Sequence, residues 1–240
     1  MPAKPRKSVS IYAILAGFAG FTLLLAALYH ASFVPLLGRH LTEVFALLFL
    51  FLPTLWFWAR HEKDFIAFGS FPRGLMWGLA VAIPLLSGYA LVHFLFFSSV
   101  CSSDSAWFSL GRSCAHYGST FHWPLSATAS LNLLGVHVIA VALPEEFFYR
   151  GFLLPLLIGS RELGRLDKKK AIIIALVIQA LLFGLGHTLV DGNPLRMAVF
   201  FPGLIFGIVA LKTKTLFAPI IIHGLANFVS EILEKGWFST

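Results

Sequence analysis

Two glutamates and one arginine lie close together in a stretch that is otherwise apolar. The stretch reads Pro144-Glu145-Glu146-Phe147-Phe148-Tyr149-Arg150-Gly151, and residues 131–143 and 152–158 beside it are mostly apolar. If these flanks cross a bilayer, the three charged groups lie at membrane depth, where an unpaired charge is costly. Ionisable groups in a membrane span indicate a functional site, whereas in a soluble helix the same charges would form a face toward water.

Helical spacing separates the roles of the two glutamates. Glu146 and Arg150 are four residues apart, so they lie one turn apart on the same face and suit an internal ion pair. Glu145 is rotated by about 100° from Glu146 and is the freer carboxylate, which suits a general base. The alternative is that all three side chains form a structural network that holds the helix in place.

Two later apolar stretches each carry a histidine. They read Phe183-Gly184-Leu185-Gly186-His187 and His223-Gly224-Leu225-Ala226-Asn227, and in each the first and last residues share one helix face. Imidazoles in membrane spans normally face the bundle interior, and adjacent glycines allow neighbouring helices to approach closely. Either histidine alone could be an interhelical hydrogen-bonding residue, but together with the glutamates they predict a catalytic site.

Three motifs, Glu145-Glu146-x-x-x-Arg150, Phe183-x-x-x-His187 and His223-x-x-x-Asn227, thus occur in order on separate apolar segments. This set resembles the motifs of the CAAX protease and bacteriocin-processing (CPBP, or Abi) family. Members of that family are intramembrane glutamic endopeptidases related to the CAAX prenyl endopeptidase. The resemblance extends over residues 131–231, and the chain before residue 131 carries none of it.

The resemblance implies a role for each catalytic position. Glu145 would be the general base that activates a water, and His187 would bind and orient that water. His223 and Asn227 would stabilise the oxyanion of the tetrahedral intermediate. Such donors contribute substantially in a dry site, about 3 kcal/mol each.

The remaining motif residues, Glu146, Arg150 and Phe183, take supporting positions in the family pattern. This agrees with the ion pair expected from the spacing of Glu146 and Arg150. The expected substrate is a membrane-associated protein or peptide, such as a prenylated tail, a peptide precursor or a C-terminal sorting tail. The resemblance implies no cofactor and selects none of these substrates.

Two other classes of function use the same residues. Glu145, Glu146, His187 and His223 are a credible ligand set for a metal ion, although the chain has no His-Glu-x-x-His signature of metalloproteases. A metal-dependent membrane protease is therefore a competing hypothesis. A transporter or an immunity protein, in which the buried charges carry ions or hold the structure, is the non-enzymatic alternative.

The composition places the whole chain in a membrane. Of its 240 residues 58% are hydrophobic and 12% are charged, whereas about a quarter of the residues in a soluble domain are charged. We expect a single all-α, integral-membrane domain over residues 1–240, a polytopic bundle of about seven to eight spans. The predicted spans are 11–29, 41–59, 74–97, a fourth from 127 that holds the two glutamates, 171–190, 197–211 and 216–233.

The positive charges predict an orientation rather than a nucleic-acid partner. The net charge is +7, and with the N-terminus inside, most lysines and arginines lie on the cytoplasmic side, as the positive-inside rule requires. Only Arg39, Arg112, Arg196 and Lys235 lie outside. We therefore expect a protein of the bacterial inner membrane with a cytoplasmic N-terminus.

The same topology places a polar loop, residues 98–126, on the non-cytoplasmic side. The loop holds both cysteines of the chain, Cys101 and Cys114. Disulfides persist in oxidising compartments, so a bridge between them is expected, and two free thiols are the alternative.

Convergence of the site residues does not follow from straight helices. His187 would lie about 24 Å from the inner end of its span, Glu145 about 18 Å and His223 about 10 Å. Tilted or kinked helices are needed to bring these three side chains to one level.

Overall fold

The computed structural model describes residues 8–59, 68–102, 114, 117–118 and 120–238, and these residues form helices joined by loops. Seven of the described helical segments are long and apolar enough to cross a membrane. The predicted all-α, polytopic bundle is therefore confirmed, and the protein is an integral membrane protein.

The N-terminal part contributes three spans. They are α1 (Ile11–His30), α3 (Leu41–Ala59) and α4 (Phe71–Ser102), and the short α2 (Pro35–Arg39) lies between the first two. Helix α4 is longer than the predicted 74–97, so the polar loop begins after Ser102 rather than at residue 98. Most of this loop lies outside the described residues.

The C-terminal part contributes the last three spans. They are α9 (Lys168–Asp191), α10 (Phe200–Thr213) and α11 (Phe217–Trp237), and the 3-10 turns η3 (Leu163–Arg165) and η4 (Pro194–Val199) precede the first two of them. The Asp167 side chain accepts hydrogen bonds from the first backbone N–H groups of α9, and Gly192, with φ of 73°, ends it.

The fourth span, residues 127–158, is not a regular α-helix. It consists of α6 (Ala127–Gly135), η1 (Val136–Ala142), α7 (Leu143–Glu146), η2 (Phe147–Leu153) and α8 (Leu154–Ile158). Segments η1 and η2 are π-helical, and their i→i+5 hydrogen bonds widen the turn and shift side chains around the helix axis. A regular α-helix over this span therefore predicts correctly which side chains share a face only over short distances.

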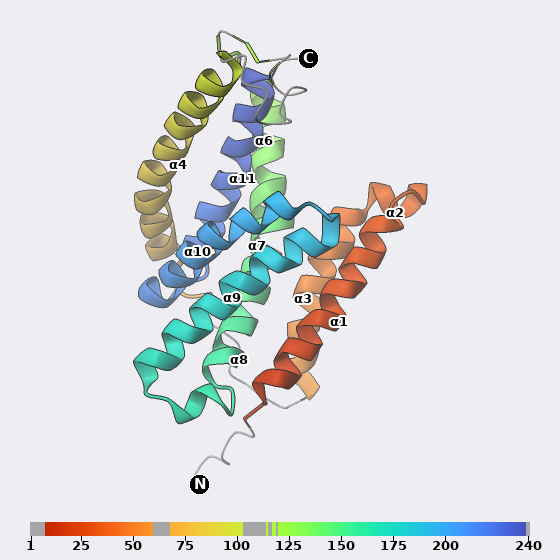
Figure 1. Ribbon diagram of the computed structural model, residues 1–240, viewed down its shortest axis with the longest axis vertical. Coiled ribbons are helices and arrows are strands. Elements are labelled where there is room, and N and C mark those ends of the chain that lie inside the picture. The colour runs from red at the N-terminus through yellow and green to blue at the C-terminus, as the bar shows by residue number, and fades with distance from the viewer. Residues whose placement is uncertain (1–7, 60–67, 103–113, 115–116, 119, 239–240) are drawn as a thin grey trace.

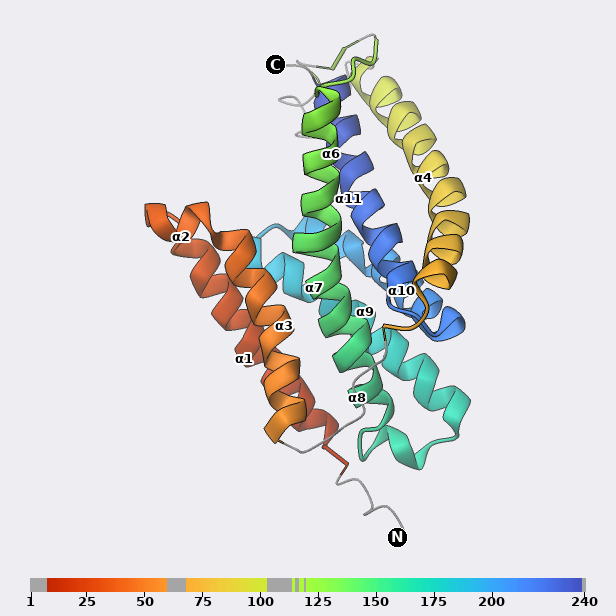
Figure 2. The ribbon, with the colours of Figure 1, turned by 180° about the vertical axis from the view of Figure 1, so that it is seen from behind.

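The fourth span runs through the middle of the molecule (Figure 1). On one side of it lie α1 and α3, and on the other side lie α4 and α11, while α9 and α10 cross the bundle obliquely (Figure 2). Aromatic side chains hold α1 and α3 against η2: the ring of Phe148 lies 4.8 Å from Phe21 and 5.3 Å from Phe49. On the other side, Ala82 of α4 and Ile222 of α11 share a buried cluster.

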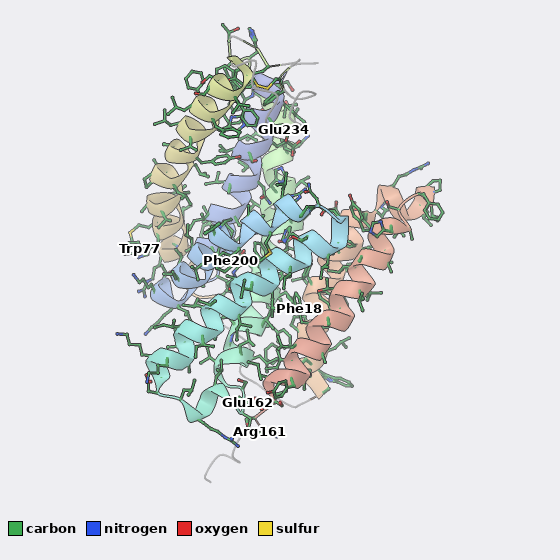
Figure 3. The ribbon with its side chains drawn as sticks, in the orientation of Figure 1. Phe18, Trp77, Arg161, Glu162, Phe200 and Glu234 are labelled. Atoms are coloured by element: carbon green, nitrogen blue, oxygen red, sulfur yellow. A yellow bond between two sulfur atoms is a disulfide. The ribbon has the colours of Figure 1, made fainter. Side chains whose placement is uncertain are left out.

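One end of the bundle, which we call the basic end, collects exposed positive charges. They are Arg73, Arg161, Arg165, Lys168, Lys169, Lys170, Lys212 and Lys214. Glu162 at this end accepts hydrogen bonds from the backbone N–H of Ile11, at 2.7 Å, and from the Ser10 hydroxyl, at 2.9 Å. These bonds, that of Ile11 first, lower the pKa of Glu162 and fasten the start of α1 to the loop before α9 (Figure 3).

The opposite end, which we call the disulfide end, carries the bridge between Cys101 and Cys114. Backbone N–H groups of Gly118 and His122 donate to the carbonyl oxygens of Trp237 and Gly236, at 2.7 and 3.1 Å. At this end of the molecule, α4 is thereby joined to Cys114, and α11 to Gly118 and His122.

Candidate active site

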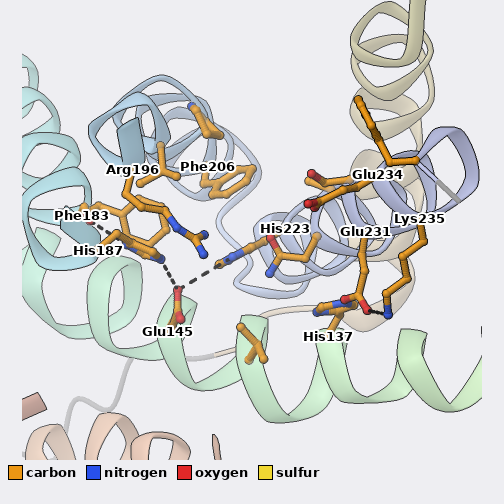
Figure 4. A pocket seen from close by; sticks show the side chains of 17 residues that line it. His137, Glu145, Phe183, His187, Arg196, Phe206, His223, Glu231, Glu234 and Lys235 are labelled. Carbon is orange, nitrogen blue, oxygen red and sulfur yellow. Dashed lines mark hydrogen bonds and ion pairs between the residues drawn. The ribbon is translucent and has the colours of Figure 1, made fainter. Parts of the chain in front are cut away.

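The carboxylate of Glu145 faces two imidazoles from two other spans. Its Oε2 atom lies 3.8 Å from Nε2 of His187 and 3.9 Å from Nε2 of His223 (Figure 4). Helix α9 crosses the bundle obliquely (Figure 1), and His187 near its end lies close to His223, which is near the start of α11 (Figure 4). The structure therefore brings together three side chains that straight, parallel helices would hold apart.

His187 is held by its own helix. Its Nδ1 atom lies 2.9 Å from the carbonyl oxygen of Phe183, one turn earlier. A carbonyl only accepts, so Nδ1 carries a proton, and Nε2, which faces Glu145, is an acceptor when the ring is neutral. The Phe183 ring, at 4.6 Å, packs edge-on against the imidazole. Both contacts fix the orientation of the ring.

His223 is held by the second glutamate. Its Nδ1 atom lies 2.8 Å from Oε1 of Glu146, and its ring stacks on Phe206 at a centroid distance of 5.1 Å. Since Glu146 is paired with an arginine and accepts as a carboxylate, Nδ1 of His223 is the donor. Its Nε2 atom then faces Glu145.

The expected contact between Glu146 and Arg150 is present in the structure. Nη1 of Arg150 lies 2.7 Å from Oε1 of Glu146, and neither side chain is exposed. Nη2 donates to the carbonyl oxygen of Gly203 at 2.9 Å, and the guanidinium lies 4.5 Å from the centre of the Phe183 ring. A buried pair of this kind needs such additional partners, because each charge has lost its water.

Two glycines permit the close packing that this cluster requires. A Cβ atom on Gly203 would lie 2.8 Å from the Phe183 ring, and one on Gly224 would lie 2.5 Å from Cγ2 of Val138. A side chain at either position would displace the neighbouring helix. Gly224 therefore sets how closely α11, with His223, approaches the fourth span.

A cavity of about 660 Å³ extends from these residues along α11. Its lining includes Glu145, Phe183, His187, His223 and Asn227. Asn227 is half-buried and lies one turn beyond His223. All four residues expected to be catalytic thus line one cavity, while Glu146 and Arg150 lie buried beside it.

The cavity also contains polar residues to which the sequence analysis gave no part in the site. Arg196 of η4 pairs through Nε with Asp191 Oδ2 at 3.0 Å, and its guanidinium extends into the cavity (Figure 4). His137 Nε2 lies 2.9 Å from Oε2 of Glu231, whose other oxygen pairs with Lys235. The partner of His137 lies 94 residues away in the chain, so no local pattern indicates this contact.

No group of three or more His, Cys, Asp or Glu side chains in the described part of the chain is arranged to hold a metal ion. Two members of the suggested ligand set, Glu146 and His223, are bonded to each other, and Glu146 is also paired with Arg150. The donor set available to a cation is therefore smaller than the sequence suggested.

A partly buried glutamate opposed by two histidines inside a membrane bundle defines a polar site that can hold a water in apolar surroundings. Residues 127–229 match a family model described as "Type II CAAX prenyl endopeptidase Rce1-like". The match covers less than half of the chain, and it supports membership of the CAAX protease (CPBP) family and, with it, a protease of the CAAX type. The matched segment contains every residue of the three motifs.

Among curated proteins and solved structures, the searches found no match to this chain.

Proposed function

We propose that the protein is a glutamic intramembrane endopeptidase that hydrolyses a peptide bond of a membrane-associated protein or peptide. The observation that carries this proposal is the position of Glu145, whose Oε2 faces Nε2 of both His187 and His223 inside one cavity. A polar separation above 3.5 Å is one that a water or a substrate oxygen can bridge.

The first step is the activation of a water by Glu145 and His187. Both Oε2 of Glu145 and Nε2 of neutral His187 are acceptors, so one water can donate a hydrogen to each of them. As the water oxygen attacks the carbonyl carbon, Glu145 takes its proton. General-base catalysis of this kind contributes about 10²–10⁴-fold to the rate.

The second step is stabilisation of the tetrahedral intermediate by His223 and Asn227. A proton on Nε2 of His223 and the Asn227 amide can donate to the oxyanion, and each donor in such a site contributes about 10²–10³-fold. A ring that donates from both nitrogens is an imidazolium, and Glu146 at its Nδ1 stabilises that charge. Glu145 then returns its proton to the leaving amine as the carbon–nitrogen bond breaks.

The decisive experiment compares substrate cleavage by the reconstituted wild type and by Glu145→Ala, each with and without a chelator. We expect loss of cleavage in Glu145→Ala and no effect of the chelator. Glu43→Gln is a matched control, because Glu43 is an exposed carboxylate far from the cavity. Normal cleavage by Glu145→Ala would exclude the glutamic mechanism.

A metal-dependent protease remains the second candidate, because Glu145, His187 and His223 are all suitable ligand types. It predicts that chelation abolishes wild-type cleavage and that added metal restores it. An ion transporter predicts flux across proteoliposomes without cleavage, and the same reconstituted preparation tests this third candidate.

A further inference from the structure

The cavity is a cleft with a closed end and an open end. Its polar lining follows one stripe of α11 from His223 through Asn227 to Lys235, which are twelve residues and so about 18 Å along the helix axis. At the closed end, the side chain of His223 is 5% exposed and that of Glu145 14%. At the other end, the side chain of Lys235 is 51% exposed. Arg196, which is 54% exposed, lies beside Phe183 and His187, and its guanidinium extends over Glu145 (Figure 4). The mouth therefore lies beside Lys235.

Residues 146–154, between the cleft and the basic end, form a packed segment that we call the seal. Every residue from Glu146 to Leu154 is buried, a run that includes three phenylalanines. One turn further, Leu157 is fully buried as well. The route from Glu145 to the basic end is thus filled with packed side chains.

The charges of the two ends differ. Among the described residues, the basic end has eight lysines and arginines against two acidic residues, Glu162 and Asp167. The end with the cleft mouth has three basic residues against four acidic ones; the latter are Glu43, Asp191, Glu231 and Glu234. Lysine and arginine accumulate on the cytoplasmic side of membrane proteins, so the mouth opens on the non-cytoplasmic side.

The disulfide supports this orientation independently of the charges. The bridge between Cys101 and Cys114 lies at the end where α11 finishes, and the chain after Cys114 bonds to Trp237 there. Disulfides persist in oxidising compartments and are rare in the cytosol. The cleft mouth and the oxidised cysteines therefore share one side of the membrane.

We infer that the cleft receives its substrate from the non-cytoplasmic side, as an extended segment of an exported, membrane-associated protein or peptide. An extended chain rises about 3.3 Å per residue, so a cleft of about 18 Å accommodates about five residues between the mouth and Glu145. Lys235 at the mouth, Ser230 along the wall and Arg196 beside His187 supply hydrogen-bond donors for the carbonyl groups of such a segment. The nature of the substrate rests on the proposed peptidase function, whereas the side of entry does not.

Accessibility of an introduced cysteine tests the side of entry. Both natural cysteines are in the disulfide, so Ser230→Cys provides the one free thiol, in the wall of the cleft. In right-side-out vesicles we expect a membrane-impermeant maleimide to label Ser230→Cys, and in inverted vesicles we expect no labelling. Lys169→Cys at the basic end is the matched control, with the opposite pattern. Ala226→Cys, deeper in the same wall, serves if Ser230→Cys does not fold.

Each other outcome contradicts the inference. Labelling of Ser230→Cys only in inverted vesicles places the mouth in the cytoplasm. Labelling from both sides shows that the seal below Glu145 is open, and labelling from neither side shows that the cleft has no aqueous mouth. Repeating the labelling with Glu145→Gln added separates the two proposals, because that change removes cleavage and leaves the side of entry unaltered.

Discussion

The two adjacent glutamates of the site have different surroundings. Glu146 is fully buried, and its Oε1 accepts hydrogen bonds from both Arg150 and His223. Glu145 lines the cavity instead. The Oε2 atoms of both glutamates have no hydrogen-bond partner in the described part of the chain, so the two residues differ in the pairing of Glu146 Oε1 and in the contact of Glu145 with the cavity. One step along the helix thus separates a carboxylate whose charge is neutralised inside the protein from one that is available to a ligand.

This difference shows how a membrane bundle can keep a reactive carboxylate. The Glu146 cluster joins the fourth span to α10 and α11 through Gly203 and His223, so it fixes the backbone on which Glu145 sits. The buried charges hold the geometry, and in the proposed mechanism the neighbouring carboxylate performs the chemistry. Substitution of Glu145 should therefore affect catalysis, whereas substitution in the Glu146 cluster should affect stability.

The largest expected effect is the loss of catalysis in Glu145→Gln. The amide keeps the shape of the side chain but cannot accept the proton of the attacking water, so kcat should fall by about 10³-fold. Because Glu145 takes no part in the buried cluster, thermal unfolding in detergent should be unchanged. An equal loss of stability and activity would show that the two glutamates are not functionally distinct.

The second effect is loss of stability in Arg150→Met. Removing one partner of a buried ion pair leaves an uncompensated charge, and about 3–5 kcal/mol of the free energy of unfolding should be lost. Denaturation in mixed micelles measures this change. Adding Glu146→Gln removes the remaining charge, so the double variant should be more stable than Arg150→Met alone. A double variant that is still less stable would contradict this account.

A smaller effect is expected at the contact between α11 and the fourth span. Gly224→Ala places a methyl group against Val138, and such overpacking costs about 1–3 kcal/mol while moving His223 away from Glu145. Cleavage should fall along with stability. Val138→Ala removes the contact with Cγ2 but keeps the one with Cα, at 3.0 Å, so it should restore both only in part.

The smallest effect concerns a third glutamate, outside the spans. Glu162 has a lowered pKa because its charged form accepts bonds from Ile11 and Ser10, so it stabilises the fold above its usual pKa. Glu162→Gln should melt slightly below the wild type at neutral pH. As the pH falls below about 4, the wild-type carboxylate gains a proton and the difference should disappear. A difference that grows in acid would contradict the assignment.

Much of the site could be predicted from the sequence, because its chemistry depends on rare residue types in apolar segments. Glu146 and Arg150 form the contact that their spacing indicated, since i,i+4 geometry is local. The bond between His223 and Glu146 could not be predicted, since it joins residues 77 apart. The sequence places Arg196 only on the non-cytoplasmic side, because no local pattern shows that η4 lies beside the cavity.

The fold could be predicted from the sequence to a similar extent. Hydropathy fixes the existence of spans, because about twenty apolar residues are required to cross a bilayer. It does not fix tilt, which packing determines, and tilt is what brings His187 to the level of Glu145. The π-helical turns on both sides of α7 have no signature in the residues of η1 or η2.

The buried run from Glu146 to Leu154 has a consequence for the cell as well as for the substrate. A hydrolytic site needs water at membrane depth, yet a continuous file of water would let protons cross an energised membrane and dissipate its gradient. Along the fourth span, Glu145 is the last residue that lines the cavity, and packed phenylalanine and leucine side chains follow it in the described part of the chain. Reconstituted vesicles containing the protein should therefore hold a proton gradient as long as empty vesicles do.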